Sequence, residues 1–513
     1  MVPGNSSSIW TRAGLHELLR ERFAGSRFIA VSNREPYIHR RRDGKIDCIQ
    51  PASGLTTALE PILRATGGTW VAHGSGDADR LVVDRRDHVA VPEDKPAYTL
   101  RRVWLDKEIE DRYYYGLANE GLWPLCHIAF HRPVFRQDDW ECYRKANQAF
   151  ADAVLEEAEG EPAFVFIQDY HFALLPRMLK ERNPNLTVAH FWHIPWPNRE
   201  VFRAFPWKEE LLDGLLGNDL LGFHLQYHCA NFLETVDRGL EAMIDEDRSE
   251  VWRRERVTRV RPFPISIDFA QHTREADGLR VQLEMERWRA ELGSQSEVIG
   301  IGIDRADYTK GIPERLKAID RLLESHEEYR GKLVFLQVAV PSRTQIDDYQ
   351  KLIEEIDTVT DTINRRWSRD GWCPIHLCRR HLPQYELMAL HRLANFCLVT
   401  SLHDGMNLVA KEFVASRSDG DGVLVLSSFT GAARELTSAL QINPFSADQM
   451  AQAIRRALTM PTGERRYRMR ALRSVVRENN IYCWAANMVG TALQPDVREY
   501  SYPQADLVSR AAG

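Results

Sequence analysis

The segment 401–412, with the sequence SLHDGMNLVAKE, has the pattern of an anion-binding site. Its polar, glycine-containing turn follows the apolar run 396–399 and leads directly into a predicted helix. The first amide groups of a helix have no acceptor within the helix and lie at the positive end of its dipole. Phosphates and sugars bind at such strand–turn–helix junctions in many α/β proteins. We therefore predict an anion site here, although an ordinary helix start has the same local pattern.

Two cations lie close together in a second junction of this kind, the segment 302–313. Arg305 could bind a diphosphate through its fork of N–H donors, and the nearby Lys310 could bind it as a point charge. The alternative is that both residues form surface ion pairs with Asp304 or Asp307.

Arginines also follow two further predicted strands. Arg34 comes shortly after the strand-like run 28–31, and Arg343 comes shortly after the long apolar run 333–340. The carboxyl ends of parallel strands border the ligand cleft in this type of sheet, so the two side chains could face each other across it. A solvated surface charge is the alternative for each arginine. Two separate cationic sites predict two phosphorylated ligands.

Aromatic and polar side chains suited to a sugar complete the set. Tyr114 and Trp123 could stack on a sugar ring, although packing in the core is the usual role of such residues. Asp169 and His193 each follow a predicted strand and could hydrogen-bond sugar hydroxyls. Metal ligation is the competing hypothesis for these two residues. The sequence lacks HExxH and any tight His/Cys cluster, so we predict no metal site. The GxGxxG dinucleotide motif and the P-loop are also absent.

The elements that must position these residues form two series of alternating strands and helices. The first series has strands at 28–31, 164–167, 188–192 and 220–223 and helices at 172–182, 198–216 and 226–240; the second has strands near 298–303, 333–340, 375–378, 396–400 and 423–427, each followed by a helix. Short strands separated by helices form parallel sheets. The proline-punctuated stretch 260–268 between the two series is the candidate hinge. We predict an α/β fold of two Rossmann-like, doubly wound domains that face each other across a cleft.

Length and composition agree with this organisation. A chain of 513 residues is long for one core, and 44% hydrophobic with 27% charged residues is typical of a soluble globular protein. We place the domains at 27–265 and 266–475, with an N-terminal extension at 1–26 and a C-terminal helix that packs back, plus a tail, at 476–513. The net charge of -6 offers no general attraction to nucleic acid or anionic membranes. Without a leader-like or membrane-spanning apolar run, the protein is expected to be cytoplasmic, with reduced cysteines.

The order of several short motifs resembles that of the trehalose-6-phosphate synthases, which are retaining glycosyltransferases of the GT-B fold. The resemblance extends from about residue 28 to about residue 490. The motifs are Ser-Asn-Arg at 32–34, Leu-Trp-Pro at 122–124, Asp-Tyr-His at 169–171, His-Ile-Pro-Trp-Pro at 193–197, Asp-Tyr-Thr-Lys-Gly at 307–311, Pro-Ser-Arg at 341–343 and Asp-Gly-Met-Asn-Leu-Val-Ala-Lys-Glu at 404–412.

This resemblance implies transfer of glucose, with retention of configuration, from a nucleotide-glucose to glucose 6-phosphate, which makes α,α-trehalose 6-phosphate. The residues implied to bind the acceptor are Arg34, Tyr114, Trp123, Asp169 and Arg343. The residues implied to bind the donor are Gly54, His193, Arg305, Lys310, Leu382, Asp404, Gly405, Met406, Asn407, Leu408, Val409 and Glu412, with Glu412 on the ribose hydroxyls. The catalytic set is His193, Arg305, Lys310 and Asp404.

In a front-face mechanism of this kind, the leaving diphosphate is stabilised by cations and amides, and no covalent nucleophile is required. We therefore expect UDP-, GDP- or ADP-glucose as co-substrate, glucose 6-phosphate as acceptor, and no cofactor or metal. No nucleic-acid or membrane partner is expected, and the protein is expected to be a homo-oligomer.

Several positions depart from the family pattern. Leu382 replaces a phenylalanine beside the nucleotide base, His403 replaces an arginine, and His73 ends a segment that is usually Trp-x-Gly-Trp. The segments 34–37 and 222–225 resemble instead the glucosylglycerol-phosphate synthases, which use glycerol 3-phosphate. That activity is one alternative, and a non-catalytic sugar-phosphate sensor is another. The intact Arg305, Lys310, Asp404 and Glu412 favour an enzyme.

Overall fold

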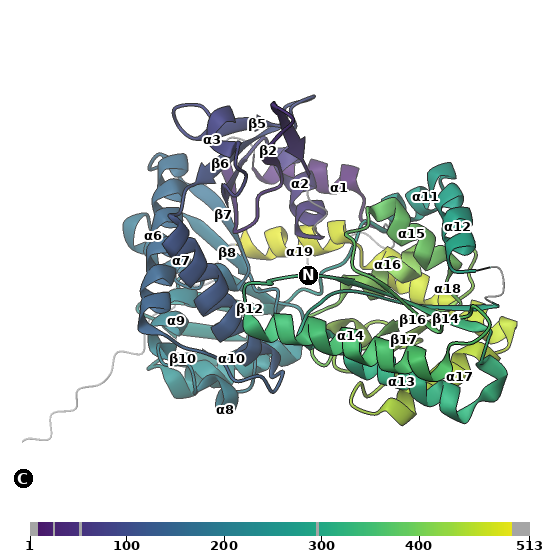
Figure 1. The fold of residues 1–513 in the computed structure, drawn as a ribbon. Helices are drawn as coiled ribbons and strands as arrows, with labels where there is room; N and C mark the ends of the chain where they lie inside the picture. The colour runs from purple at the N-terminus through teal and green to yellow at the C-terminus, as the bar shows by residue number, and fades with distance from the viewer. Residues whose placement is uncertain (1–8, 24–25, 51–53, 294–296, 495–513) are drawn as a thin grey trace, which may run out of the picture.

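The computed structural model describes residues 9–23, 26–50, 54–293 and 297–494, which form two halves with a sheet in each (Figure 1). Continuous apolar runs such as Leu333–Val340 become the central strands because both of their faces are covered. The expected α/β architecture with two parallel-stranded sheets is confirmed. Among the described residues, no helix combines the length and apolar character needed to cross a bilayer.

The first half is built on a ten-stranded sheet. In order across the sheet, its strands are β10 (Met243–Asp245), β11 (Glu250–Arg253), β12 (Arg256–Pro262), β9 (Leu220–Phe223), β8 (Thr187–Phe191), β7 (Ala163–Gln168), β1 (Arg27–Ser32), β4 (Thr69–His73), β6 (Tyr98–Val103) and β5 (His88–Val91). The strands from β12 to β6 are parallel, and only the outer pairs are antiparallel. A separate antiparallel hairpin follows β1 and consists of β2 (Ile38–Arg42) and β3 (Lys45–Ile49).

The second half holds six strands that are all parallel. Their order is β15 (Ile375–Cys378), β14 (Leu333–Val340), β13 (Val298–Arg305), β16 (Phe396–Val399), β17 (Val423–Ser427) and β18 (Leu440–Ile442). Five of them were predicted from the sequence. The sixth, β18, is a short edge strand without a strong apolar run.

Helices cover both faces of each sheet. In the first half they are α1 (Arg12–Arg22), α2 (Gly54–Thr66), α3 (Asp79–Val82), α4 (Lys107–Glu110), the π-helix η1 (Asp111–Leu122), α5 (Trp123–His127), α6 (Gln137–Ala158), η2 (Tyr170–Phe172), α7 (Leu175–Arg182), α8 (Arg199–Phe202), α9 (Lys208–Leu215) and α10 (Gln226–Gly239). In the second they are α11 (Phe269–Ala276), α12 (Leu279–Glu291), η3 (Tyr308–Lys310), α13 (Ile312–Ser325), η4 (Glu327–Tyr329), α14 (Asp347–Trp367), α15 (Gln384–Leu393), α16 (Leu408–Ser416), η5 (Gly431–Arg434), α17 (Ala447–Thr459), α18 (Thr462–Glu478) and, crossing back, α19 (Ile481–Ala492).

Strand β1 shows how the first sheet is buried. Its successive side chains point to opposite faces, so Ile29 and Val31 join the cluster that includes Phe150 of α6, while Phe28 and Ala30 join the main core on the other side. Both faces are therefore apolar, and the carboxyl end of the strand is the place where polar side chains can reach a ligand.

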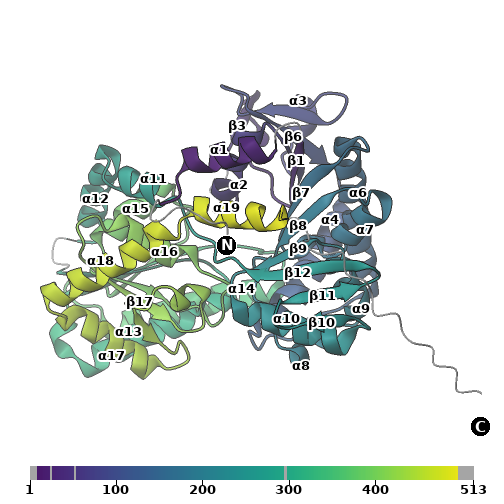
Figure 2. The ribbon, with the colours of Figure 1, turned by 180° about the vertical axis from the view of Figure 1, so that it is seen from behind.

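The two halves are connected where the chain crosses after β12 and again where it returns at α19. The backbone N–H of Ile481 donates to the carbonyl of Ile267 at 3.0 Å, so the two crossings are hydrogen-bonded to each other. Trp484 of α19 packs against Phe166 and Phe191 of the first sheet, with ring centroids 5.8 and 5.1 Å away. Figures 1 and 2 show α19 lying with the first half while α18 lies with the second. The domain bounds given above stay predictions.

Two sequence expectations need correction. The predicted helix 198–216 is two helices, α8 and α9, because Pro206 lies between them and lacks the N–H that a continuous helix needs. The first part of the candidate hinge 260–268 is not a free connection, because residues up to Pro262 belong to β12 and pair with β9.

Candidate active site

A cavity of about 240 Å³ lies where the two halves meet. It is lined by Ser32, Asn33, Arg34, Tyr114, Trp123, Gln168, Asp169, Tyr170, His171, His193, Arg305 and Arg343. The first half contributes residues that end or follow β1, β7 and β8 or lie on η1, α5 and η2. The second half contributes the two arginines that end or follow β13 and β14. The structure thus brings all five predicted acceptor residues together in one cavity.

Arg343 is held in place from several directions. Its Nη1 donates to the hydroxyl of Tyr349 and, at 3.3 Å, to Oδ2 of Asp307, and its Nη2 donates to the hydroxyl of Tyr170 at 3.4 Å. The guanidinium carbon lies 4.0 Å from the ring centroid of Trp123. These contacts fix the cation while its Nε–H stays without an acceptor among the described residues. Arg343 is therefore preorganised to bind an anion.

The electrostatic effect of the two facing arginines is visible on Tyr114. Burial alone disfavours its ionised form, but Arg34 and Arg343 outweigh burial and lower the pKa of the phenol to about 8. A cavity that stabilises a phenolate to this extent will also attract a phosphate. Because Trp123 lies beside Arg343, the anion and a stacked ring can bind next to each other.

Asp169 and His193 line the same cavity and contact each other. Oδ1 of Asp169 accepts from the backbone N–H groups of Tyr170, at 2.9 Å, and of His193, at 3.3 Å. Burial raises the pKa of Asp169 to about 6 and lowers that of His193 to about 3, so the imidazole is neutral near pH 7. Nε2 of His193 lies 3.0 Å from Oε1 of Gln168. A neutral imidazole and a carboxylate suit hydrogen bonds to hydroxyl groups.

A larger cavity of about 520 Å³ adjoins the first and is lined mainly by the second half. Of the predicted donor residues, Arg305, Leu382, Val409 and Glu412 line it. Apolar side chains such as Ile303 and Leu387 form much of its wall. Burial raises the pKa of Glu412 to about 7, and no cation among the described residues pairs with its carboxylate. Arg34 and Arg305 line both cavities, so the two spaces have a common boundary.

Lys310 and Asp404 line neither cavity and instead form an ion pair. Nζ of Lys310 lies 2.5 Å from Oδ2 of Asp404, and the side chains of Ser401 and Asn407 donate to the same oxygen at 3.1 and 3.2 Å. Although burial acts in the opposite direction, Lys310 keeps the pKa of Asp404 well below its usual value. The alternative pairs do not form, because Asp304 pairs with Arg315 and Asp307 with Arg343.

The turn before α16 has the predicted anion-binding geometry. Asn407, at φ 84, caps the helix by accepting from the N–H of Ala410 at 3.1 Å. A Cβ on Gly405 would lie 2.5 Å from the carbonyl oxygen of His193, so only glycine lets this turn approach the end of β8 so closely. Met406 is buried, and Leu408 begins the helix. In the described part of the chain, the N–H groups of residues 405–409 have no protein acceptor.

Two further positions singled out in the sequence, His403 and His73, also lie outside the linings of both cavities. His403 contacts the first half, with Nδ1 2.7 Å from the carbonyl oxygen of His127. His73 is buried with Nδ1 3.1 Å from the carbonyl of Val103. Gly54 is described only as the first residue of α2, because its surroundings lie outside the described residues.

Sequence reasoning missed the residues that support the site from behind. Asp307 bonds both Arg343 and the hydroxyl of Tyr349, at 3.3 and 3.2 Å. The residues Ser266–Asp268, after the first chain crossing, line the larger cavity. The signal for Asp307 was its place in the 307–311 motif. No local pattern indicates Tyr349, and the crossing residues were predicted only as part of the candidate hinge 260–268, not as part of the site.

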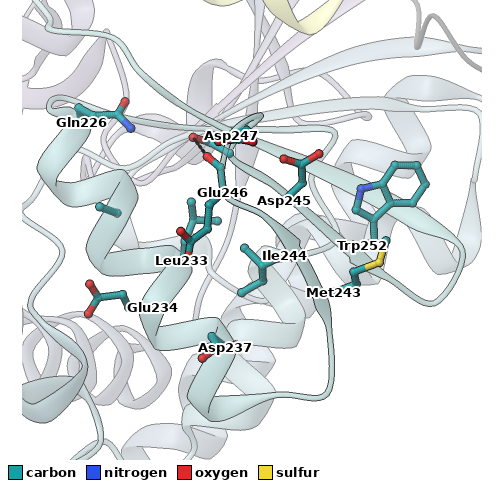
Figure 3. A pocket seen from close by; sticks show the side chains of 12 residues that line it. Gln226, Leu233, Glu234, Asp237, Met243, Ile244, Asp245, Glu246, Asp247 and Trp252 are labelled. Atoms are coloured by element: carbon teal, nitrogen blue, oxygen red, sulfur yellow. Dashed lines mark hydrogen bonds between the residues drawn. The ribbon is translucent and has the colours of Figure 1, made fainter.

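A still larger cavity, of about 840 Å³, lies apart from this site, between α10 and the β10–β11 hairpin (Figure 3). Its lining includes no lysine or arginine and carries the carboxylates of Glu234, Asp237, Asp245, Glu246 and Asp247. Because these negative charges repel phosphate, the cavity is not a candidate for either predicted anion.

Comparison with known proteins gives one consistent result. The sequence model of glycosyltransferase family 20 matches residues 26–494. A trehalose-6-phosphate synthase of Mycolicibacterium paratuberculosis is 39% identical over 487 residues, which cover 93% of this chain and 97% of that protein.

Two solved structures are similar over the same range. A trehalose-6-phosphate synthase structure from E. coli, bound with UDP-2-fluoro glucose, has a TM-score of 0.82 at 32% identity and covers 91% of this chain and 99% of its own. An α,α-trehalose-phosphate synthase (UDP-forming) from Burkholderia xenovorans, in complex with glucose-6-phosphate, has a TM-score of 0.81 at 31% identity and covers 91% and 100%.

Proposed function

The chain belongs to glycosyltransferase family 20, and from this premise we propose that it transfers glucose, with retention of configuration, from a nucleotide-glucose to glucose 6-phosphate. The product is α,α-trehalose 6-phosphate. The UDP sugar and the glucose 6-phosphate bound to its solved relatives support this pair of substrates.

The observation that carries the proposal is the pair of adjoining cavities with Arg34 and Arg305 at their boundary. The smaller cavity, which Arg34, Arg305 and Arg343 line together with Tyr114 and Trp123, suits a sugar phosphate. The larger one, with an apolar wall and the carboxylate of Glu412, suits a nucleoside. A donor placed this way brings its diphosphate and sugar to the boundary, next to the acceptor hydroxyl.

The chemistry then follows from the charges around that boundary. As the bond between glucose and the diphosphate breaks, negative charge grows on the leaving phosphate, where Arg305, Lys310 and the N–H groups of 405–409 would stabilise it. The acceptor hydroxyl attacks from the same face, and its proton passes to the leaving phosphate. Asp404 holds Lys310, and neutral His193 would hydrogen-bond the transferred sugar. These roles are proposals for the named residues.

A matrix of donors and acceptors tests the proposal. We expect the highest kcat/KM with glucose 6-phosphate and one nucleotide-glucose, UDP-glucose being the first to test alongside GDP- and ADP-glucose. NMR of the product should show an α,α-1,1 linkage. An inverted linkage, or turnover with neither phosphorylated acceptor, would contradict it.

Glucose 6-phosphate is expected to be preferred over glycerol 3-phosphate by at least about 100-fold in kcat/KM. Both acceptors could place a phosphate on Arg34 and Arg343, but only a hexose can cover the rings of Tyr114 and Trp123 and bond the polar groups around them. Glycerol 3-phosphate would leave some of these polar groups without a hydrogen-bond partner, and this weakens its binding. The comparison uses the best donor at saturation. A higher kcat/KM for glycerol 3-phosphate would assign the protein to the glucosylglycerol-phosphate synthase alternative.

Donor affinity is expected to fall as the pH is lowered through 7. Burial raises the pKa of Glu412 to about 7, so below that pH its carboxylate carries a proton and loses an acceptor for ribose hydroxyls. The dissociation constant for UDP-glucose should then rise by up to about tenfold per pH unit. Calorimetry without acceptor measures it, and Glu412→Gln should give weak, pH-independent binding. A constant wild-type affinity from pH 8 to pH 6 would remove Glu412 from the ribose site.

Activity is expected to persist in excess EDTA. The site offers arginine, lysine and helix amides to the diphosphate, and these replace the charge that a bound Mg²⁺ supplies in other transferases. Initial rates with and without the chelator, after gel filtration, should agree. Inactivation that a divalent ion reverses would show a metal role.

The expected cytoplasmic location, the homo-oligomeric state and the lack of nucleic-acid or membrane partners remain predictions. Light scattering of the purified protein would measure the oligomeric state.

A further inference from the structure

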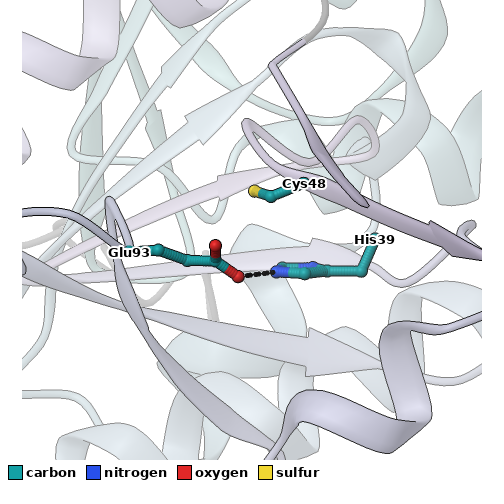
Figure 4. A group of neighbouring side chains, drawn as sticks. All are labelled: His39, Cys48 and Glu93. Atoms are coloured by element: carbon teal, nitrogen blue, oxygen red, sulfur yellow. Dashed lines mark hydrogen bonds and ion pairs between the residues drawn. The ribbon is translucent and has the colours of Figure 1, made fainter. Parts of the chain in front are cut away.

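Outside the two cavities, His39, Cys48 and Glu93 bring three metal-binding groups together, with their ligand atoms all within 4.8 Å of one another (Figure 4). We propose that these residues bind a zinc-class divalent ion at a site that is separate from the transfer reaction. Imidazole nitrogen, thiolate sulfur and carboxylate oxygen are the usual zinc ligands. The proposal does not depend on which substrates the enzyme uses.

The local backbone places two of the ligands. His39 on β2 and Cys48 on β3 are direct partners across the hairpin, so their side chains lie on the same face of it. Glu93 comes from the chain that follows edge strand β5, and its Oε1 lies 3.2 Å from Nε2 of His39. Figure 4 shows the carboxylate pointing at the imidazole, with the sulfur above the two. Segments distant in the sequence therefore converge on one point.

The spacing requires only a small contraction. Zinc–ligand bonds of about 2.0 to 2.3 Å in a tetrahedron put ligand atoms about 3.3 to 3.8 Å apart. His39 is fully buried and fixed, whereas the side chain of Glu93 is 59% exposed and that of Cys48 is half-buried, so these two can move inward. Three protein ligands leave the fourth position to water.

The groups behind His39 can accommodate the bound form. Nδ1 now lies 2.8 Å from Nη2 of Arg102, which donates to it, so the ring proton is on Nε2 and faces Glu93. When Nε2 binds a metal, the ring proton moves to Nδ1, so the hydrogen bond from Nη2 of Arg102 to Nδ1 is lost, and Oδ1 of Asp79, 3.4 Å from Nδ1, becomes the acceptor. Arg102 keeps its bond to the carbonyl of Tyr37 at 3.1 Å.

The surrounding charges also permit a cation here. Arg102 is fully buried and forms ion pairs with both Asp79 and Glu35, so its positive charge is already neutralised beside the site. Metal binding by these three ligands moves one proton from Nε2 to Nδ1 of His39 and releases one proton from the thiol of Cys48. Affinity should therefore fall as the pH is lowered.

The site would link the β2–β3 hairpin to the chain after β5. That hairpin follows Arg34 closely in the sequence, so metal binding should stabilise the segment next to the acceptor cavity. We expect bound Zn²⁺ to raise the Tm of the protein while the metal-free enzyme stays active.

The test is a Co²⁺ titration of the full chain without a histidine tag, followed by displacement with Zn²⁺. The wild type should bind one ion and show thiolate-to-cobalt charge-transfer absorption, and Cys48→Ser should abolish that absorption. Glu93→Ala should retain it but weaken binding by more than about tenfold, because losing a ligand costs at least as much as losing a residue that only hydrogen-bonds a ligand. These two residues are chosen because His39 is buried and its replacement risks the fold.

Cys373→Ser, which removes another partly buried thiol, is the matched control and should behave as the wild type. The proposal fails if the wild type shows no charge-transfer absorption, if Cys48→Ser retains it, or if Glu93→Ala leaves the affinity unchanged.

Discussion

Replacing Arg305 with alanine is expected to lower kcat/KM by about 100- to 1000-fold, because it removes a charged donor from the growing negative charge of the leaving diphosphate. Arg305 ends β13 at the boundary of both cavities, and no carboxylate lies within ion-pair distance of it among the described residues. Its charge is thus available to a ligand. Steady-state kinetics with each substrate varied would measure the loss.

Two variants separate the loss of this charge from a general loss of structure. Arg305→Lys keeps a point charge without the fork of donors and should recover part of the activity. Arg289→Ala removes an exposed arginine on α12 and should leave kcat/KM unchanged. Near-normal turnover by Arg305→Ala, with an unchanged Tm, would remove Arg305 from the mechanism.

Replacing Lys310 with alanine is expected to lower kcat/KM by a similar factor and, in addition, to destabilise the fold. The side chains of Lys310 and Asp404 are only 12% and 14% exposed, so the variant leaves a mostly buried carboxylate without its cation. Breaking such a pair costs about 3 kcal/mol, and somewhat less here because Ser401 and Asn407 still bond Asp404. Urea unfolding would measure the change in the free energy of unfolding.

The double variant Lys310→Met with Asp404→Asn distinguishes the two effects. It removes both charges together, so most of the lost stability should return while the activity stays low. If activity returned along with stability, Lys310 would have only a structural role. If Lys310→Ala were as stable as the wild type, the pair would not form in solution.

The sequence predicts β1, β7, β8 and β9 of the first sheet and β13 to β17 of the second, because parallel strands covered on both faces have continuous apolar sequences, as in 164–167 and 333–340. The same reasoning misses β10, β11 and β5, which are only three or four residues long and lie in the outer parts of the sheet, and it also misses the interior strands β4 and β6. It also gives no sign of the π-helix η1, which carries Tyr114 toward the smaller cavity. Edge strands and unusual helices depend on contacts with distant segments.

The candidate site likewise contains some residues that the sequence predicts and others that it does not. Arg34, Asp169 and Arg343 all lie at or just beyond strand ends and line one cavity. The position of parallel strand ends beside the ligand cleft predicts that the two arginines face each other, and the family resemblance adds Asp169 to them. The partner of Lys310 could not be predicted in this way, because Asp404 lies on a different loop and was expected to bind the donor. The nearby Asp304 and Asp307 looked equally suitable from the sequence, and both are taken by arginines.

Arg34 and Arg305 come from opposite halves of the protein, and each lines both cavities. A ligand in one cavity that orients either guanidinium therefore changes the binding free energy of a ligand in the other cavity. Thermodynamic linkage makes this effect reciprocal, so the factor by which the nucleotide changes affinity for the sugar phosphate must equal the factor in the opposite direction. An affinity measured for either substrate alone thus describes a different equilibrium from the one that operates during turnover.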